Sequence, residues 1–116
     1  MNNEMIVFKK AKELIDYTFS MTENTNRYSK RRRFTFVDRM QNLSLNIYSD
    51  LLKANEFPAK ERINLQTNVV ADVKTLLFLI ELSYSRGFID EKQLFNWAKI
   101  GKDVLYLTTA WKNKTK

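Results

Sequence analysis

Residues that form turns are scarce in this chain, and this scarcity limits the folds that it can adopt. Its 116 residues include two glycines and one proline. Sheets and sandwiches need many tight turns, and tight turns depend on Gly and Pro. The composition therefore favours a few long helices joined by short connections. With this length and 44% hydrophobic residues, we expect a single domain over residues 1–116.

Apolar residues recur at spacings of three and four in four segments, which is the pattern of amphipathic helices. The expected helices span about residues 3–22, 35–55, 58–86 and 90–111. Four such helices with short links predict an all-α fold, an antiparallel up-down-up-down four-helix bundle. In that topology the first connection and the turn between the last two helices lie at one end, with Arg86 and Lys92 nearby.

Several helix ends can be placed from local signals. Thr35 and Asp38 have the spacing of a capping box, which predicts a helix start at Thr35. A second capping box begins at Asp90, and Gly87 is expected to end the third helix. Gly101 stands in the middle of the fourth helix, where glycine lowers stability, so we expect a close approach to another helix there.

The stretch RYSKRRR (27–33) concentrates the positive charge of a chain whose formal net charge is +7. Its cations are Arg27, Lys30, Arg31, Arg32 and Arg33. Like charges repel one another, and cations ahead of a helix N-terminus oppose the helix dipole. A feature that lowers local stability suggests a function, and a polyanion is the partner that positive charge favours. The alternative is a solvated, mobile loop.

Two aromatic residues, Tyr28 and Phe34, flank these cations. We expect Tyr28 to stack on a nucleobase, and Phe34 to pack beneath the helix start as a hydrophobic staple. The remaining aromatic residues lie at helical spacings, and we expect them in the core: Phe8, Phe19, Tyr48, Phe78, Tyr84, Phe95, Trp97, Tyr106 and Trp111.

Catalytic signals are absent from the sequence. The chain has no Cys and no His, which removes thiolate ligands, Cys nucleophiles and the most common general base. It also has no Gly-rich phosphate loop. We therefore expect no enzyme, no catalytic residue, no metal and no cofactor. Glu81, inside the apolar run 76–82, is the one carboxylate in an unusual position, either buried and paired or at the rim of an interface.

The apolar run 76–82 also bears on partners and location. It is far shorter than the roughly 20 residues that span a bilayer, and no secretory signal is visible, so we expect a cytoplasmic protein without a membrane partner. Apart from Glu81 the run is apolar nearly all round, which predicts burial on more than one side. A homo-oligomer would supply the second contact and would multiply the basic surface.

Several short motifs resemble one family. The stretches RFTF (33–36) and RMQN (39–42), LSY (82–84), GFI (87–89), KQ (92–93), IG (100–101) and Trp111 occur in similar order and spacing. They resemble the four-helix-bundle proteins that include the accessory variability determinant of diversity-generating retroelements, and the related proteins of intervening sequences in bacterial ribosomal RNA genes. The resemblance covers roughly residues 5–111. It implies pentameric rings with basic surfaces that bind nucleic acid and a reverse transcriptase and are not enzymes.

These observations give one leading hypothesis and its alternatives. The chain is predicted to be a non-catalytic, basic adaptor that binds RNA or an RNA–DNA hybrid, with a reverse transcriptase as the protein partner that the resemblance implies. The alternatives are a ribosomal intervening-sequence protein, a module that binds an acidic protein, and an enzyme that uses carboxylates or Lys. The predicted nucleic-acid-binding residues are Arg27, Tyr28, Lys30, Arg31, Arg32, Arg33 and Arg39.

Overall fold

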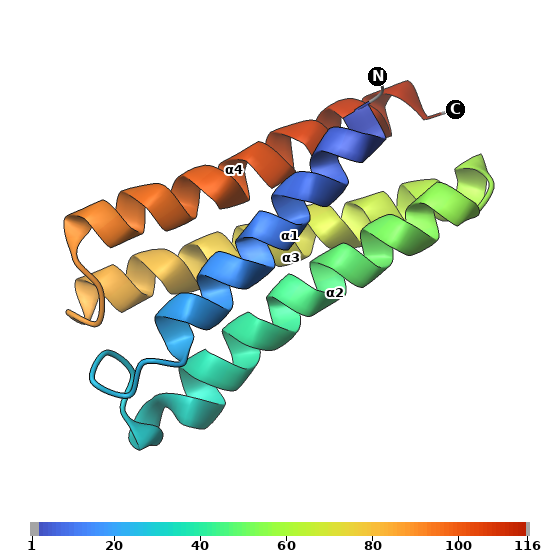
Figure 1. The fold of residues 1–116 in the computed structure, drawn as a ribbon. Helices are drawn as coiled ribbons and strands as arrows, with labels where there is room; N and C mark the ends of the chain where they lie inside the picture. Colours follow the sequence, from blue (N-terminus) through green and yellow to red (C-terminus); the bar gives the residue numbers. More distant parts are fainter. Residues whose placement is uncertain (1–2, 116) are drawn as a thin grey trace.

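Four α-helices pack against one another in the computed structural model, which describes residues 3–115 (Figure 1). They are α1 (Asn3–Thr22), α2 (Asp38–Glu56), α3 (Ala59–Ser85) and α4 (Glu91–Lys114). A 3₁₀ turn (Lys30–Arg32) and a π-helical turn (Arg33–Val37) come directly before α2. The described residues contain no strand, so the predicted all-α class is confirmed.

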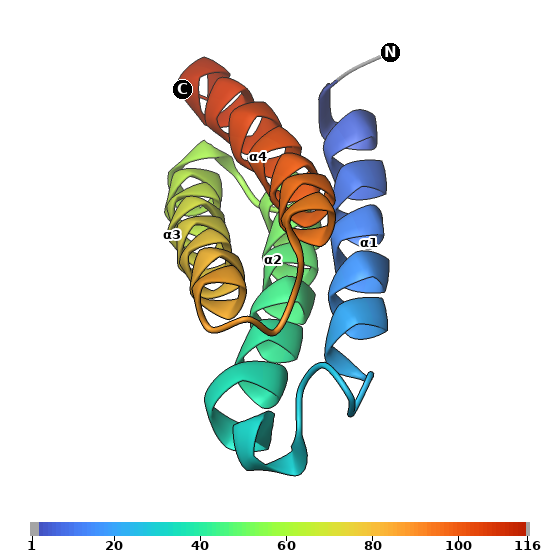
Figure 2. The same ribbon diagram turned by 90° about the vertical axis from the view of Figure 1, so that its left-hand side faces the viewer.

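The connections alternate between the two ends of the molecule. The segment that joins α1 to α2 and the turn that joins α3 to α4 lie at one end (Figures 1 and 2). The connection between α2 and α3 lies at the other end, together with the first turn of α1 and the last turn of α4. The basic segment and the turn after α3 therefore share one end.

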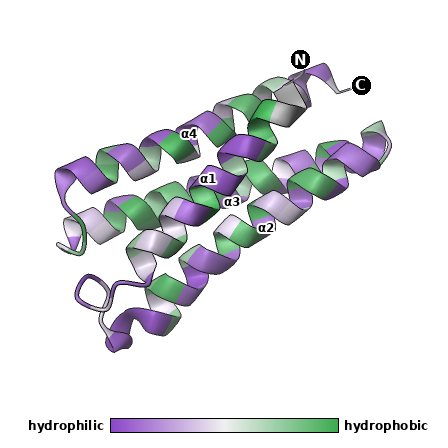
Figure 3. Cartoon of the chain, in the orientation of Figure 1, coloured by the Kyte–Doolittle hydropathy of each residue, from purple (hydrophilic) through white to green (hydrophobic). Residues whose placement is uncertain are grey.

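All four helices contribute to one cluster of buried side chains, and a hydrogen bond between two buried side chains joins α4 to α1. Trp97 of α4 is fully buried. Its indole N–H donates to Thr18 Oγ1 of α1 at 3.0 Å. Figure 3 shows hydrophobic and hydrophilic residues alternating along each helix, as expected for helices that bury one face.

The helix-end signals after residue 85 are confirmed. Gly87 has a φ of 81°, a left-handed conformation that favours glycine. Its N–H donates to the Tyr84 carbonyl oxygen at 2.9 Å, and the Phe88 N–H donates to the Ser83 carbonyl oxygen at 2.8 Å. Asp90 and Gln93 form the predicted capping box at the start of α4. The turn between α3 and α4 is therefore fixed by local hydrogen bonds.

Gly101 also lies where the sequence predicted a close helix contact. A Cβ at this position would stand 2.9 Å from Leu77 Cδ2 of α3. The missing side chain leaves room for the Leu77 side chain of α3 against the middle of α4. The intrinsic cost of a glycine within a helix is offset by packing at this point.

The apolar run 76–82 is only partly covered by the rest of the molecule. Leu76 and Ile80 are buried, whereas Phe78 is 60% exposed and Glu81 is also exposed. Glu81 is thus a surface carboxylate, not a buried one. By length and composition alone, α3 meets the criterion for a helix that crosses a membrane. In this fold it packs against α2 and α4, and a core helix of a bundle meets the same criterion.

The prediction that the other aromatic residues lie in the core is right for some and wrong for others. Trp97 and Trp111 are buried, and Phe8, Phe19 and Tyr48 are half-buried. Four are exposed instead: Phe78, Tyr84, Phe95 and Tyr106. Their helical spacing widened the predicted apolar stripes beyond the faces that the neighbouring helices cover.

Candidate nucleic-acid interface

The basic residues lie in the segment between α1 and α2, which begins with a tight turn. The Asn26 N–H donates to Asn24 Oδ1 at 2.9 Å. The Arg27 and Tyr28 N–H groups both donate to the Asn24 carbonyl oxygen, at 3.0 and 2.8 Å. Asparagine favours such turns because its side chain can accept from the backbone two residues later. The turn reverses the chain and directs residue 28 back toward the bundle.

Tyr28 does not reach solvent, so its prediction as a base-stacking residue is wrong. It is 2% exposed. Its ring packs edge-on against Phe88 with centroids 5.4 Å apart, and it also lies near Phe36 at 6.3 Å. Phe36 and Phe88 pack edge-on at 5.1 Å. We name Tyr28, Phe36 and Phe88 the aromatic anchor, because these three rings tie the basic segment to the turn after α3.

The residues that follow Tyr28 are helical, which corrects the predicted loop. The Arg32 N–H donates to the Ser29 carbonyl oxygen at 2.9 Å and closes the 3₁₀ turn. The Asp38 N–H then donates to the Arg33 carbonyl oxygen, which is the i to i+5 bond of a π turn. Lys30, Arg31, Arg32 and Arg33 therefore stand on an ordered backbone just ahead of α2.

The predicted helix start at Thr35 is wrong for the same reason. Thr35 lies inside the π turn, and α2 begins at Asp38 without a side-chain cap. Phe34 is not a staple, because it is 82% exposed, whereas Phe36 is 8% exposed and joins the aromatic anchor. Residues two apart on a helical turn point to nearly opposite sides, so the burial of Phe36 directs Phe34 outward.

The cations of this segment have few counter-charges. Residues 29–35 are all exposed, and Figure 3 colours the turns ahead of α2 as hydrophilic. Arg33 Nε lies 3.9 Å from Asp38 Oδ1, in an exposed ion pair. The Arg32 guanidinium lies 5.1 Å from the centre of the Phe88 ring. Lys30 and Arg31 form no ion pair with any residue that the structure describes. We name Lys30, Arg31, Arg32 and Arg33 the basic turn.

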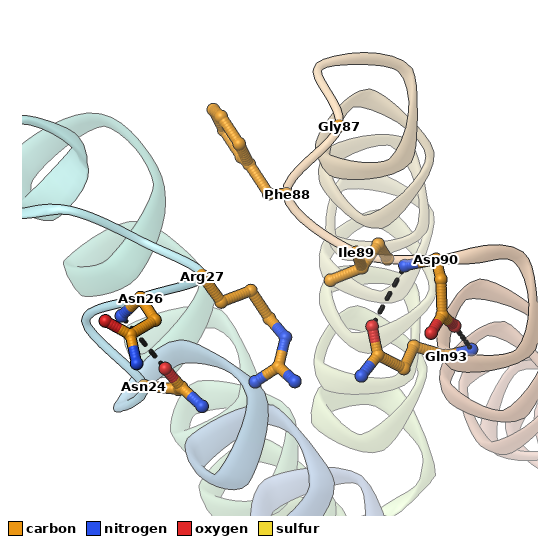
Figure 4. A pocket seen from close by; sticks show the side chains of 8 residues that line it. All are labelled: Asn24, Asn26, Arg27, Gly87, Phe88, Ile89, Asp90 and Gln93. Atoms are coloured by element: carbon orange, nitrogen blue, oxygen red, sulfur yellow. Dashed lines mark hydrogen bonds between the residues drawn. The ribbon is translucent and has the colours of Figure 1, made fainter.

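Arg27 lies apart from the basic turn, on the side that faces the turn after α3. It is half-buried and lines a shallow hollow of about 370 Å³. Figure 4 shows its side chain extending toward Gln93, whose side chain and backbone are held by Asp90. The hollow thus lies between the basic segment and the start of α4. Asp90 also lines this hollow, so the hollow carries both positive and negative charge.

A second hollow, of about 470 Å³, lies between the basic segment and the start of α2. Lys30 and Arg33 contribute positive charge to its lining, and Glu23 and Asp38 contribute negative charge. The Gln41 side-chain N–H donates to Thr22 Oγ1 at 3.0 Å and links α2 to the end of α1 beside it. Arg39, in the first turn of α2, is exposed. The strongest uncompensated positive charge is therefore on the basic turn, where Arg31 and Arg32 lie outside both hollows.

The sequence missed the roles of Phe36 and Phe88 in holding this site. One signal for them was present: Phe34 and Phe36 are two residues apart, so a helical turn can bury only one of them.

The sequence pattern did not single out Asp72 of α3 either. Burial raises the pKa of the Asp72 carboxyl, and the nearby Asp50 charge raises it further. Neither carboxylate lines the two hollows beside the basic segment.

The residues predicted to bind nucleic acid are thus divided by the structure. Lys30, Arg31, Arg32 and Arg33 are consecutive and exposed, and Arg39 is exposed in the first turn of α2. Arg27 lies on the side that faces α4, and Tyr28 is in the core. Comparisons of the chain with models of protein families, with curated proteins and with solved structures found no match.

Proposed function

We propose that this protein is a non-catalytic adaptor that binds nucleic acid through the basic turn. One observation supports this most: four consecutive exposed cations stand on an ordered backbone, and among the described residues they form one ion pair, which is exposed. An ordered array of like charges lowers the stability of the folded chain, since flexible loops would let the charges separate. Phosphate groups at regular spacing are the counter-charges that such an array suits.

The resemblance supports a narrower form of the proposal. The motifs RFTF (33–36) and GFI (87–89), which carry the resemblance, contain Phe36 and Phe88 of the aromatic anchor. We infer a cytoplasmic accessory protein of a retroelement reverse transcriptase, with RNA or an RNA–DNA hybrid as its ligand. The alternating connections in Figure 1 support an antiparallel up-down-up-down course for the four helices.

We also infer a homo-oligomer, a pentamer by the resemblance. The support from this chain is that α3 and α4 leave large aromatic side chains in solvent. Phe78 of α3 is joined by Phe95 and Tyr106 of α4, which are 68% and 74% exposed. An assembly would place several basic turns on one particle and strengthen binding to a long polyanion.

The test is a binding titration with a structured RNA at several salt concentrations. Five phosphate contacts, from Arg27 and the basic turn, give a log–log salt slope of about −3.5 to −4.5. Replacing Lys30, Arg31, Arg32 and Arg33 by Ala should weaken binding sharply and reduce the magnitude of the slope by about 3. The matched control replaces four exposed lysines elsewhere: Lys53, Lys60, Lys74 and Lys102.

This control separates a defined site from net charge, because both variants lose the same number of positive charges. Equal losses of affinity in the two variants would show that overall charge binds the RNA, and unchanged affinity in the first variant would refute the proposal.

The second candidate function is a module that binds an acidic protein, favoured by the mixed charges of the hollow beside Lys30 and Glu23. It predicts co-purification with a protein and no shift of RNA.

A further inference from the structure

Phe34 has the largest exposed fraction of any large hydrophobic side chain that the structure describes. A single exposed apolar residue is ordinary on protein surfaces. Its surroundings are what distinguish Phe34: it directly follows the four cations of the basic turn. It is also the one apolar side chain in the exposed stretch 29–35.

The outward position of Phe34 is imposed by the fold. Phe36 is locked between Tyr28 and Phe88, so the π turn cannot rotate to bury Phe34 without breaking these ring contacts. Arg39, another exposed cation, lies five residues after Phe34, in the first turn of α2. The ring is thus held in solvent with cations before and after it in the sequence.

We infer that Phe34 is a stacking platform for an unpaired nucleobase, and that the ligand of the basic turn is single-stranded or contains unpaired bases. This inference rests on the proposed function. Guanidinium and ammonium groups bind phosphates, and an exposed ring beside them binds the flat face of a base. Every base offers such a face, so the contact requires no particular sequence.

A fully paired duplex does not use this arrangement. Its base faces are covered by their neighbours in the stack, so an aromatic side chain among the phosphate contacts gains little. An anionic membrane would also attract cations beside a Phe. Membrane-surface segments, however, bury a broad apolar face, and here Phe34 is surrounded in sequence by charged and hydroxyl side chains. The surface therefore favours unpaired nucleic acid.

The experiment compares full-length variants on two RNA probes and one vesicle. The first probe is a single-stranded oligoribonucleotide with 2-aminopurine at its centre, whose fluorescence reports stacking. The second is a fully paired RNA duplex, and the vesicle contains phosphatidylserine and phosphatidylcholine. The variants are Phe34→Ala, Phe34→Trp and, as a matched control, Phe57→Ala, which removes an exposed ring from the connection between α2 and α3.

The expected result is specific to Phe34 and to unpaired bases. Phe34→Ala should weaken single-strand binding roughly tenfold to a hundredfold and abolish the 2-aminopurine signal, because one stacked base is lost. Affinity for the duplex and the salt slope should stay unchanged, since the phosphate contacts remain. Phe34→Trp should keep single-strand binding, and Phe57→Ala should bind as the unchanged protein does.

Three outcomes would overturn the inference. They are equal losses by Phe34→Ala on both RNA probes, no loss on either, or a loss confined to the vesicle. If the Ala variant of the basic turn loses RNA binding while Phe34→Ala does not, the stacking inference fails and the proposed function stands. If the unchanged protein binds neither RNA, both fail.

Discussion

At the scale of single residues, Tyr28 has the most unusual environment. Its hydroxyl is buried and has no hydrogen-bond partner among the residues that the structure describes. Burial raises its pKa to about 12, although the nearby Ser83 hydroxyl and the positive charge of Arg27 lower it in part. An unfolded chain binds the same proton with a pKa near 10. The folded state therefore holds this proton more tightly than the unfolded state does.

This difference makes stability depend on alkaline pH. The contribution is fully present below about pH 10 and is lost as pH rises toward about 12, because ionisation then favours the unfolded chain. We expect Tyr28→Phe to remove this loss, a difference on the order of 2 kcal/mol, and to keep the stability at neutral pH within about 1 kcal/mol. Urea denaturation of both proteins across this pH range measures it. Parallel pH profiles would contradict the prediction.

At the scale of elements, two similar sequence signals had different outcomes. Asp90 and Gln93 form the predicted capping box, whereas Thr35 and Asp38 share its spacing and form none. The difference comes from contacts that are distant in the sequence. Phe36 packs on Phe88, which lies in the turn between α3 and α4, and this contact extends the helical backbone upstream of Thr35. A local pattern contains no information about such a contact.

The two signals give one prediction. Asp90→Ala should destabilise the protein by about 1 kcal/mol, because it removes the acceptor for the Gln93 N–H. Thr35→Ala should be close to neutral, because the Thr35 hydroxyl caps no helix. Chemical denaturation of the two variants measures the difference, and Asp90→Asn, which keeps an acceptor oxygen, is the control. A similar loss of stability from both Ala variants would show that Thr35 also stabilises a helix start.

The same distinction explains how much of this molecule the sequence reveals. The four helices, the turn at Gly87 and the close approach at Gly101 follow from periodicity and local chemistry, and all are present. The identity of the basic segment followed from charge. Which side chains of the segment are buried and which are exposed did not follow from charge. The burial of Tyr28 and the exposure of Phe34 depend on which ring reaches Phe88.

At the scale of the whole molecule, the surface carries both a concentrated charge and exposed rings on α3 and α4. These rings support the proposed homo-oligomer, because large aromatic groups in solvent gain free energy when a second copy covers them. We expect sedimentation equilibrium at micromolar concentrations to give a mass that is a multiple of the 13.8 kDa of one chain. Phe78→Ser should shift the protein toward the single-chain mass, with its helical circular dichroism unchanged.

Phe34→Ser is the matched control for this experiment. It also removes an exposed ring, but from the end of the molecule that carries the basic turn, where we propose nucleic acid binds. It should therefore lower single-strand binding and keep the assembled mass, whereas Phe78→Ser should lower the mass. A single-chain mass for the unchanged protein would remove the oligomer from the proposal. Binding would then depend on one basic turn per particle, and affinity for a long RNA should equal that for a short one.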